Sequence, residues 1–380
     1  MKNPATTSVL PIAGLLLAAL VASSCSADVN NNAPTGTTSA GASAAAGQRT
    51  VDDGGCTKNS ERIAQLQAEL DKNLYGIAAA ESDKATNTNP NPVPPDKKIK
   101  IAFSIEGLSH PFLVKQKELA EAEAARLGVD IQVISANDDV NQQFNDLQNA
   151  ITQGVDALMM MPAKTQGLDA VLGQASAQNI PYFFTQKGML GVQPASQVLA
   201  PYANEGRQLG QWVAEHYKDE DNVNVLVITG ITGDASSVAR VNAFEIELLK
   251  ACNFTILAEQ PGQYRREESN KAAENMLAAH KDVDLVFGAN DEAALGAIAA
   301  IEAAGRTGID VVGLDGQKEM FTAIEQGKAL ATVIHKPTAG ILVGEVVKYL
   351  RGEPVPQYKV LDEDLVTKER IETGSVEPAF

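Results

Sequence analysis

Polar side chains follow the strand-like segments of this chain at nearly every strand end. Most are carboxylates, carboxamides and cationic groups, with an aromatic among them. Carboxylates and amides accept hydrogen bonds from adjacent hydroxyls, guanidinium and ammonium groups donate to oxygens, and aromatic faces cover the apolar side of a ring. These types together predict a site for a polyhydroxylated small molecule. The residues are Glu106, His110, Lys164, Gln186, Lys187, Arg240, Tyr264, Asn290, Asp291, Asp315 and His335.

Motifs for catalysis are missing from the sequence. It contains no Gly-x-Ser-x-Gly elbow, no His-Glu-x-x-His, no Walker phosphate loop and no dinucleotide glycine fingerprint. The four histidines are widely spaced, and no Cys/His spacing suggests a metal site. We therefore expect a binding protein that has no catalytic residues, no metal and no cofactor.

The elements that must position these side chains alternate regularly between strand and helix. A first series has strands at 98–104, 129–135, 155–161 and 180–185, with helices at 112–127, 140–152 and 167–178. A second series has strands at 222–229, 254–260, 283–289 and 309–314, with helices at 236–252, 266–280 and 292–304. Apolar strands that alternate with amphipathic helices indicate parallel sheets covered on both faces. Two series predict two doubly wound α/β lobes, with ligands bound at the carboxyl ends of the strands.

Six short stretches of this region carry a specific resemblance. They are His110-Pro111-Phe112, the run 230–233 followed by Arg240 and Phe244, and the runs 260–264, 289–296, 311–316 and 331–335. In this order and at this spacing they match one family. From about Lys97 to Glu369 the chain resembles the periplasmic ribose-binding-protein family, the type I sugar-binding components of ABC importers.

The resemblance implies a fold of two lobes joined by a three-segment hinge, with crossovers near Tyr202, His335 and Asp362. The N-terminal lobe would comprise residues 97–202 plus 336–361, and the C-terminal lobe residues 203–335 plus 362–372. Closure about such a hinge buries the ligand between the lobes. The implied partners are a sugar or polyol and a membrane-bound ABC permease, and the protein is expected to be a monomer.

By position in the family, Phe112 would stack on the sugar ring and Tyr264 would cover its other face. Arg240 would donate to ring and hydroxyl oxygens, Asn290 would bond hydroxyls, and Asp315 would accept from two of them. The complete set of predicted ligand-binding residues is Glu106, His110, Phe112, Gln186, Lys187, Arg240, Tyr264, Asn290, Asp315 and His335.

The sequence departs from the family pattern on the side of the first lobe. Gln186-Lys187 stands where the family has an Asp-Arg pair. The replacement exchanges a charged acceptor for a neutral amide, and a bidentate guanidinium for the point charge of an ammonium group. His335 replaces the usual Gln of the second hinge segment, and Glu106 and His110 replace small or amide residues. These departures argue against ribose as the ligand. The near-balance of charge favours a neutral pentose, hexose or cyclitol, with a sugar acid as the alternative.

Composition narrows the partners. The chain has 380 residues, 44% of them hydrophobic, and a formal net charge of −17. This length is typical of two folded domains. The acidic excess argues against a nucleic-acid partner, because phosphate neutralisation requires an excess of Lys and Arg.

The N-terminus predicts export. Lys2 is the only charge before Asp28, and the apolar run 9–22 is too short to span a membrane but fits a secretory signal. The sequence Ala-Ser-Ser precedes Cys25, as in a lipobox. We predict that residues 1–24 are a lipoprotein signal peptide and that Cys25 is lipidated, which is the protein's only attachment to the membrane. The protein would then lie in the periplasm or on the outer face of the cell membrane. An ordinary signal peptide before a coincidental cysteine is the alternative.

Residues 25–96 predict a flexible tether, a short amphipathic helix over about 60–80 and a Pro-rich linker at 87–96. The helix is expected to pack on the folded region, with self-association as the alternative. Cys56 and Cys252 could form one disulfide between this extension and the folded region, and their spacing leaves that question open. The predicted function is delivery of the bound sugar to an importer, and the alternative is a sensor that presents its closed form to a chemoreceptor or histidine-kinase ectodomain.

Overall fold

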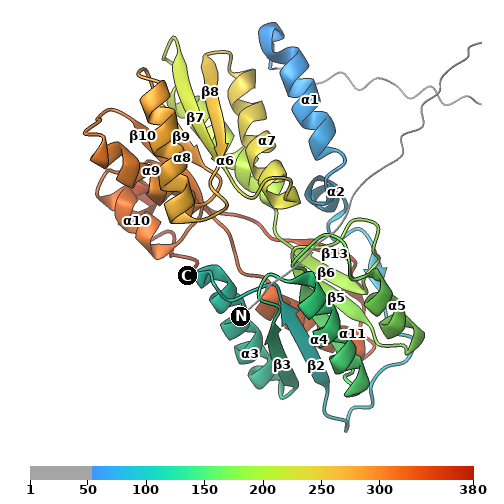
Figure 1. The fold of residues 1–380 in the computed structure, drawn as a ribbon. Coiled ribbons are helices and arrows are strands. Elements are labelled where there is room, and N and C mark those ends of the chain that lie inside the picture. Colours follow the sequence, from blue (N-terminus) through green and yellow to red (C-terminus); the bar gives the residue numbers. More distant parts are fainter. Residues whose placement is uncertain (1–53) are drawn as a thin grey trace, which may run out of the picture. The chain divides into compact units, whose positions relative to one another are not determined.

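The computed structural model describes residues 54–380, with the backbone alone at residues 79 and 80. The predicted signal peptide and the lipidation site at Cys25 lie outside the described residues. Within 54–380 the chain forms two six-stranded sheets, each flanked by helices (Figure 1). No helix in this range is long and apolar enough to cross a membrane.

The first sheet has the strand order β13-β6-β5-β4-β2-β3, and all its strands are parallel. Its strands are β2 (Lys100–Ile105), β3 (Asp130–Ser135), β4 (Ala157–Met161), β5 (Tyr182–Gln186), β6 (Ser196–Leu199) and β13 (Tyr358–Val360). Its helices are α3 (Pro111–Leu127), α4 (Val140–Thr152), α5 (Asp169–Ala177) and α11 (Ala339–Leu350). We call this sheet and its helices the first lobe.

The second sheet has the order β14-β11-β10-β9-β7-β8, and only β14 is antiparallel to its neighbour. Its strands are β7 (Val223–Thr229), β8 (Phe254–Pro261), β9 (Leu285–Gly288), β10 (Asp310–Asp315), β11 (Ala331–Ile334) and β14 (Leu365–Thr367). Its helices are α6 (Tyr202–His216), α7 (Ala235–Lys250), α8 (Arg266–Ala279), α9 (Asp291–Ala303), α10 (Lys318–Glu325) and α12 (Lys368–Glu372). This is the second lobe.

Both faces of each sheet are buried, as apolar parallel strands require. In β7, Val225 and Val227 pack into one hydrophobic cluster, whereas Leu226 and Ile228 pack into another on the opposite face. Side chains alternate between the faces of a strand, so a run of consecutive apolar residues covers both. This arrangement confirms the fold class of two doubly wound parallel-sheet lobes.

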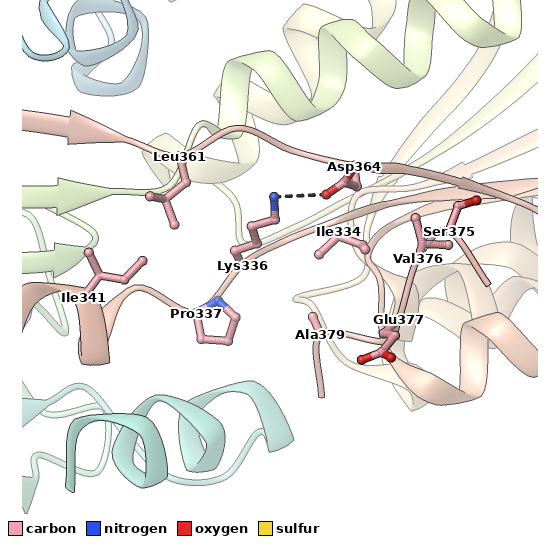
Figure 2. Close-up of a pocket in the computed structure, with 10 residues that line it drawn as sticks. All are labelled: Ile334, Lys336, Pro337, Ile341, Leu361, Asp364, Ser375, Val376, Glu377 and Ala379. Atoms are coloured by element: carbon pink, nitrogen blue, oxygen red, sulfur yellow. Dashed lines mark ion pairs between the residues drawn. The ribbon is translucent and has the colours of Figure 1, made fainter. Parts of the chain in front are cut away.

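The chain passes from one sheet to the other after β6, after β11 and after β13. These passages lie at 200–201, 335–338 and 361–364, beside the three predicted crossovers. A pocket of about 450 Å³ lies against the second and third passages (Figure 2). Lys336 and Asp364 form an ion pair at its wall, at 3.1 Å. None of the ten predicted ligand-binding residues lines this pocket.

The N-terminal extension differs from the expectation of one helix over 60–80. It forms η1 (Thr57–Asn59), α1 (Ser60–Leu70) and α2 (Leu74–Glu81), with a break where Asn73 takes an extended conformation and caps α2. Its side chain accepts a hydrogen bond from the backbone N–H of Tyr75, at 3.0 Å. Such a cap starts a new helix in a new direction.

The predicted Pro-rich linker also begins with paired backbone. Thr86–Asn87 forms the short strand β1, antiparallel to β12 (Val355–Pro356). This pairing is a two-stranded ladder outside both large sheets, so the prolines that follow Asn87 interrupt no sheet interior. The sulfurs of Cys56 and Cys252 are bonded, 2.07 Å apart, and this bond joins the extension to the end of α7.

Candidate functional site

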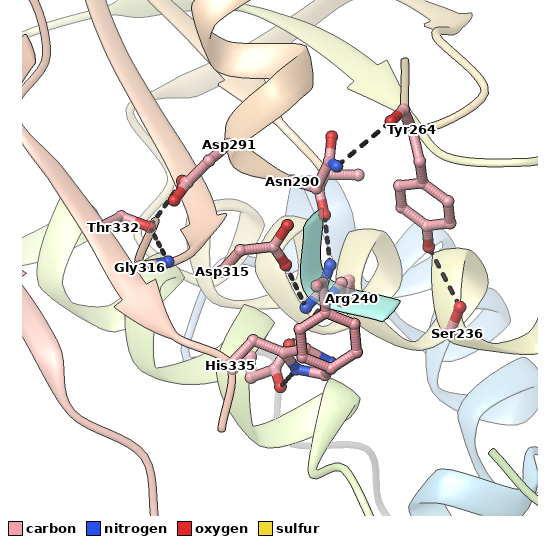
Figure 3. Close-up of polar contacts among 12 residues, drawn as sticks. Ser236, Arg240, Tyr264, Asn290, Asp291, Asp315, Gly316, Thr332 and His335 are labelled. Atoms are coloured by element: carbon pink, nitrogen blue, oxygen red, sulfur yellow. Dashed lines mark hydrogen bonds and ion pairs between the residues drawn. The ribbon is translucent and has the colours of Figure 1, made fainter. Parts of the chain in front are cut away.

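Arg240 is the centre of a buried polar cluster at the carboxyl edge of the second sheet (Figure 3). Its Nη2 donates to Asp315 Oδ1 at 2.9 Å, its Nη1 to the carbonyl of Ala289 at 3.0 Å, and its Nε to Glu205 Oε2 at 2.6 Å. Two carboxylates flank the guanidinium and raise its pKa further, against the effect of burial. The cation is therefore permanent and fixed in direction.

Glu205 reaches Arg240 because α6 and α7 lie unusually close together. A Cβ added at Gly206 would stand 2.1 Å from the carbonyl oxygen of Arg240. Glycine is the residue that permits such an approach between helix backbones. Arg240 and His335 together hold the pKa of the Glu205 carboxyl below its usual value despite complete burial.

Asn290 and Tyr264 stand next to this cluster. Asn290 caps α9 by accepting from the N–H of Ala293 at 2.9 Å, and its amide donates to the Tyr264 carbonyl at 3.4 Å. Asn290 is thus the N-cap residue of α9. The Tyr264 hydroxyl lies 3.1 Å from Ser236 Oγ, and burial raises its pKa to about 12. The hydroxyl is therefore a neutral donor.

His335 and Gln186 connect the two lobes at the second passage. His335 Nδ1 lies 2.5 Å from Glu205 Oε1, and its Nε2 lies 2.5 Å from the Gln186 side-chain nitrogen. Gln186 also accepts from Gln116 at 2.8 Å and from Thr338 at 2.6 Å. A charged carboxylate at position 186 would lack the amide donor used here, which gives a physical reason for the departure from Asp.

Lys187 and Glu106 lie at the carboxyl edge of the first sheet. They pair at 2.9 Å with side-chain exposures of 17% and 12%. Burial raises the pKa of the Glu106 carboxyl, and the Lys187 ammonium opposes that shift. Asp234 of the second lobe also interacts with Lys187, which contributes to lowering the Asp234 pKa. Charges from both lobes therefore meet across this edge.

Phe112 and His110 begin α3 of the first lobe. The Phe112 ring lies 4.8 Å from the His335 ring and 5.5 Å from the ring of the C-terminal Phe380. His110 Nδ1 caps the helix by accepting from the N–H of Phe112 at 3.1 Å. His110 Nε2 is buried and has no hydrogen-bond partner within 54–380. A buried polar atom of this kind is costly unless a ligand or water meets it.

Backbone conformation singles out three of the predicted residues. Gln186, Tyr264 and Asp315 have φ of 63°, 58° and 138°. Non-glycine residues rarely adopt positive φ, and such strain concentrates at ligand sites. The Tyr264 ring fits there because residue 230 is glycine, since a Cβ at that position would lie 2.2 Å from the ring.

The structure thus brings Arg240, Asn290, Asp315, Tyr264 and His335 into one cluster, and Phe112 and Gln186 reach it through His335. Glu106 and Lys187 form a second, connected group. Sequence reasoning missed Glu205 and Asp234. Asp234 caps α7, so the Asp-Ala-Ser-Ser run at the start of that helix was an available signal, whereas Glu205 carried none.

Two covered sheets, three passages and a polar cluster between the carboxyl edges define the type I periplasmic binding proteins. The family model of the periplasmic binding protein domain matches residues 101–353, and the chain belongs to this family. The family consists of solute-binding proteins rather than enzymes, and membership implies a periplasmic location. Within residues 54–380, no group of His, Cys, Asp and Glu side chains could hold a metal ion.

Several relatives of known ligand are similar to this chain. The ribose import binding protein RbsB of Escherichia coli K12 is 29% identical over 273 residues, which cover 71% of this chain and 90% of that protein. The xylitol-binding protein of Mycolicibacterium smegmatis is 26% identical over 268 residues, which cover 69% of this chain and 76% of that protein. The Caulobacter myo-inositol binding protein, solved with myo-inositol, has a TM-score of 0.68 at 27% identity and covers 75% and 99% of the two chains.

Proposed function

We propose that this protein captures a monosaccharide or polyol between its two lobes and delivers it to an ABC importer. The observation that carries the proposal is the fixed guanidinium of Arg240 between Asp315 and Glu205, beside Asn290 and Tyr264. This set offers charged acceptors, a charged donor, an amide and a neutral phenol. Adjacent hydroxyls of a polyol donate and accept in the same pattern.

The proposed ligand is neutral. The ion pairs Lys187–Glu106 and Arg240–Asp315 each combine one positive and one negative charge. A carboxylate ligand would add a negative charge next to Glu106, Asp234 and Asp315. Ribose, xylitol and myo-inositol, the ligands named for the relatives, are all neutral polyhydroxy compounds, which supports this class.

Isothermal titration calorimetry of the purified protein against D-ribose, xylitol, myo-inositol and D-gluconate tests the proposal. We expect at least one neutral probe to bind with a micromolar Kd, equivalent to about −8 kcal/mol. We expect D-gluconate not to bind. Native mass spectrometry of the purified protein would identify a ligand that remains bound through purification. Failure of every neutral probe to bind, together with no retained polyol, would refute the sugar assignment.

We further propose that Cys25 carries the lipid anchor. In the native host, Cys25→Ala is expected to release the protein from the membrane fraction and to abolish labelling by a palmitate analogue, with Cys56→Ser as the matched control. Labelling that survives Cys25→Ala contradicts the anchor. A permease and an ATPase encoded beside the gene favour delivery, whereas a neighbouring histidine kinase favours the sensor alternative.

A further inference from the structure

The N-terminal strap, residues 56–87, is fixed to the second lobe at its beginning. The Cys56–Cys252 disulfide anchors it to the end of α7. Ile63, Leu66 and Leu70 of α1 are buried in one cluster with side chains of α7. The Asn73 amide donates to the carbonyl of Ala235 at 2.9 Å, at the other end of α7. The strap therefore follows α7 from its last residue to its first (Figure 1).

The later part of the strap is fixed to the first lobe. Leu74 and Ala78 pack with Leu199 of β6. Asp83 N–H donates to the Tyr358 carbonyl at 2.9 Å, and β1 pairs with β12. The strap therefore connects the lobes through α2, which packs on α6 and α7 of the second lobe and on β13 of the first, in addition to the three passages at the hinge.

Tyr75 of α2 is buried in one cluster with Tyr202, Ala203 and Ala239 of the second lobe. Its side chain is 3% exposed. Burial, followed by the charges of Asp234 and Glu106, raises the pKa of its hydroxyl well above 10.0. Those two carboxylates belong to opposite lobes. The hydroxyl is a neutral donor within electrostatic reach of both edges.

The ring of Tyr75 also supports the Arg240 cluster. It meets the Tyr202 ring edge-on, with centroids 4.5 Å apart. The Arg240 guanidinium carbon lies 5.0 Å from the centre of the same Tyr202 ring. A cation over an aromatic face is attracted by the ring quadrupole. Tyr75 thus contacts a residue that lies against the central cation, and the charges that act on its hydroxyl come from Asp234 and Glu106.

We infer that the N-terminal strap forms one wall of the ligand site and that Tyr75 is a specificity-determining residue for the bound polyol. This inference rests on the proposed function and extends it to residues outside the region matched by the family model. Tyr75 would donate one hydrogen bond to a ligand hydroxyl and limit the length of ligand that fits between the lobes. Monosaccharide-sized polyols would be accepted, and longer saccharides would be excluded by the ring.

The test compares Tyr75→Phe and Tyr75→Ala with wild type by calorimetry against D-ribose, xylitol, myo-inositol and a disaccharide, maltose. The matched control is Tyr349→Phe, which alters a half-buried tyrosine of α11 that packs on Phe183. Far-UV circular dichroism verifies that each variant is folded. Hydrogen exchange of residues 71–86 is also measured in wild type, with and without the tightest probe. This measurement tests the contact between strap and ligand without a substitution.

Tyr75→Phe is expected to weaken the tightest probe about tenfold, the usual effect of one lost hydrogen bond. Tyr75→Ala is expected to favour maltose. Its affinity for maltose, divided by its affinity for the tightest probe, should be at least tenfold higher than in wild type. Tyr349→Phe should stay within about twofold. The tightest probe should slow exchange over residues 71–86.

Two failures are distinguishable. If wild type binds a polyol but both Tyr75 variants keep all affinities within about twofold and exchange over 71–86 is unchanged, the strap is not part of the site. If wild type binds none of the probes, the proposed function falls and this inference falls with it.

Discussion

The two carboxyl edges that face one another are built differently. At the second sheet, Arg240 and Asp315 are almost inaccessible, with side-chain exposures of 4% and 6%, and every guanidinium nitrogen has a partner. At the first sheet, Lys187 and Glu106 are more accessible, and His110 Nε2 has no partner within 54–380. The Arg240 guanidinium is therefore fully paired within the second edge. The first edge instead keeps a buried imidazole nitrogen that no group of residues 54–380 meets.

The same division runs through the sequence. The residues of the second edge match the family pattern, and the departures from that pattern lie at the first edge and at the hinge. Under the proposed function, the second edge would supply the general means of holding a polyol, while the first edge and the strap would distinguish one polyol from another. The following predictions would break or sharpen this contrast.

Arg240→Met is expected to have the largest effect. It leaves the carboxylates of Glu205 and Asp315 buried beside no guanidinium, which costs about 3–5 kcal/mol of unfolding free energy, and it should lower affinity by more than about 100-fold. Urea denaturation and calorimetry measure the two effects. Lys187→Met at the first edge is the matched control and should cost less, because its ion pair with Glu106 is more accessible than that of Arg240 with Asp315. Equal losses for the two variants would contradict the contrast.

Removal of the disulfide is expected to rank second. Cys56→Ser/Cys252→Ser opens a loop between residues with a sequence separation of 196, and such bridges contribute about 2–4 kcal/mol. Thermal and urea unfolding measure the loss. Wild type in reductant should approach the double variant, while the double variant should not respond to reductant. A double variant as stable as wild type would mean that the strap is held by its other contacts alone.

Glu363 lies in the third passage, between the two edges, and both its oxygens are buried without a hydrogen-bond partner within 54–380. Burial is the largest cause that raises the pKa of Glu363 to about 10, and the negative charges of Glu205 and Asp364 add to the shift. The positive charges of Lys336 and Arg240 oppose it. The folded state then retains a proton that an unfolded Glu, with a pKa of about 4.3, has lost. Its contribution to stability is full below about pH 4.3 and is lost as pH rises towards 10.

Glu363→Gln should remove that dependence, by up to about 1.4 kcal/mol per pH unit within this window. Urea unfolding at pH 5 and pH 8 compares the slopes of variant and wild type, with Glu353→Gln, an exposed site, as the control. Parallel pH profiles for Glu363→Gln and wild type would show that the carboxyl is ionised in the folded protein.

The smallest effect is expected for the ion pair of the first edge. A double-mutant cycle of Glu106→Gln and Lys187→Met should give a smaller coupling in stability than a cycle of Arg240 and Asp315, because this pair is less completely buried. Affinity should change only about three- to tenfold, and by different factors for ribose, xylitol and myo-inositol. Uniform changes across the probes would argue that this edge does not discriminate.

The alternating fold was predictable because its signal is local. Consecutive apolar residues such as those of β7 predict a strand covered on both faces, and Gly128 ends α3 in the left-handed conformation expected of a helix terminator. The short strands β6 and β14 were missed, since four or three residues carry no measurable period, and the helix α10 was missed although it has eight residues. The break in the extension was missed because Asn73 interrupts an apolar pattern that continues on both sides of it.

The site was predictable where a residue follows a strand, as Asp315 and Asn290 do. Glu205 could not be found this way, because an acidic residue in the first turn of a helix is ordinary and its role depends on how closely Gly206 lets α6 approach α7. Tyr75 sits in an apolar helix and carried only a packing signal. Both roles arise from contacts between segments more than 30 residues apart in the sequence, such as that of Arg240 with Glu205.

The order in which the chain is made gives the disulfide a further consequence. Cys56 precedes Cys252 by 196 positions, and a chain is synthesised amino terminus first. The first part of the strap therefore cannot pack on the second lobe until α7 has been produced. The disulfide can form only after Cys252 has been produced, and in an oxidising compartment.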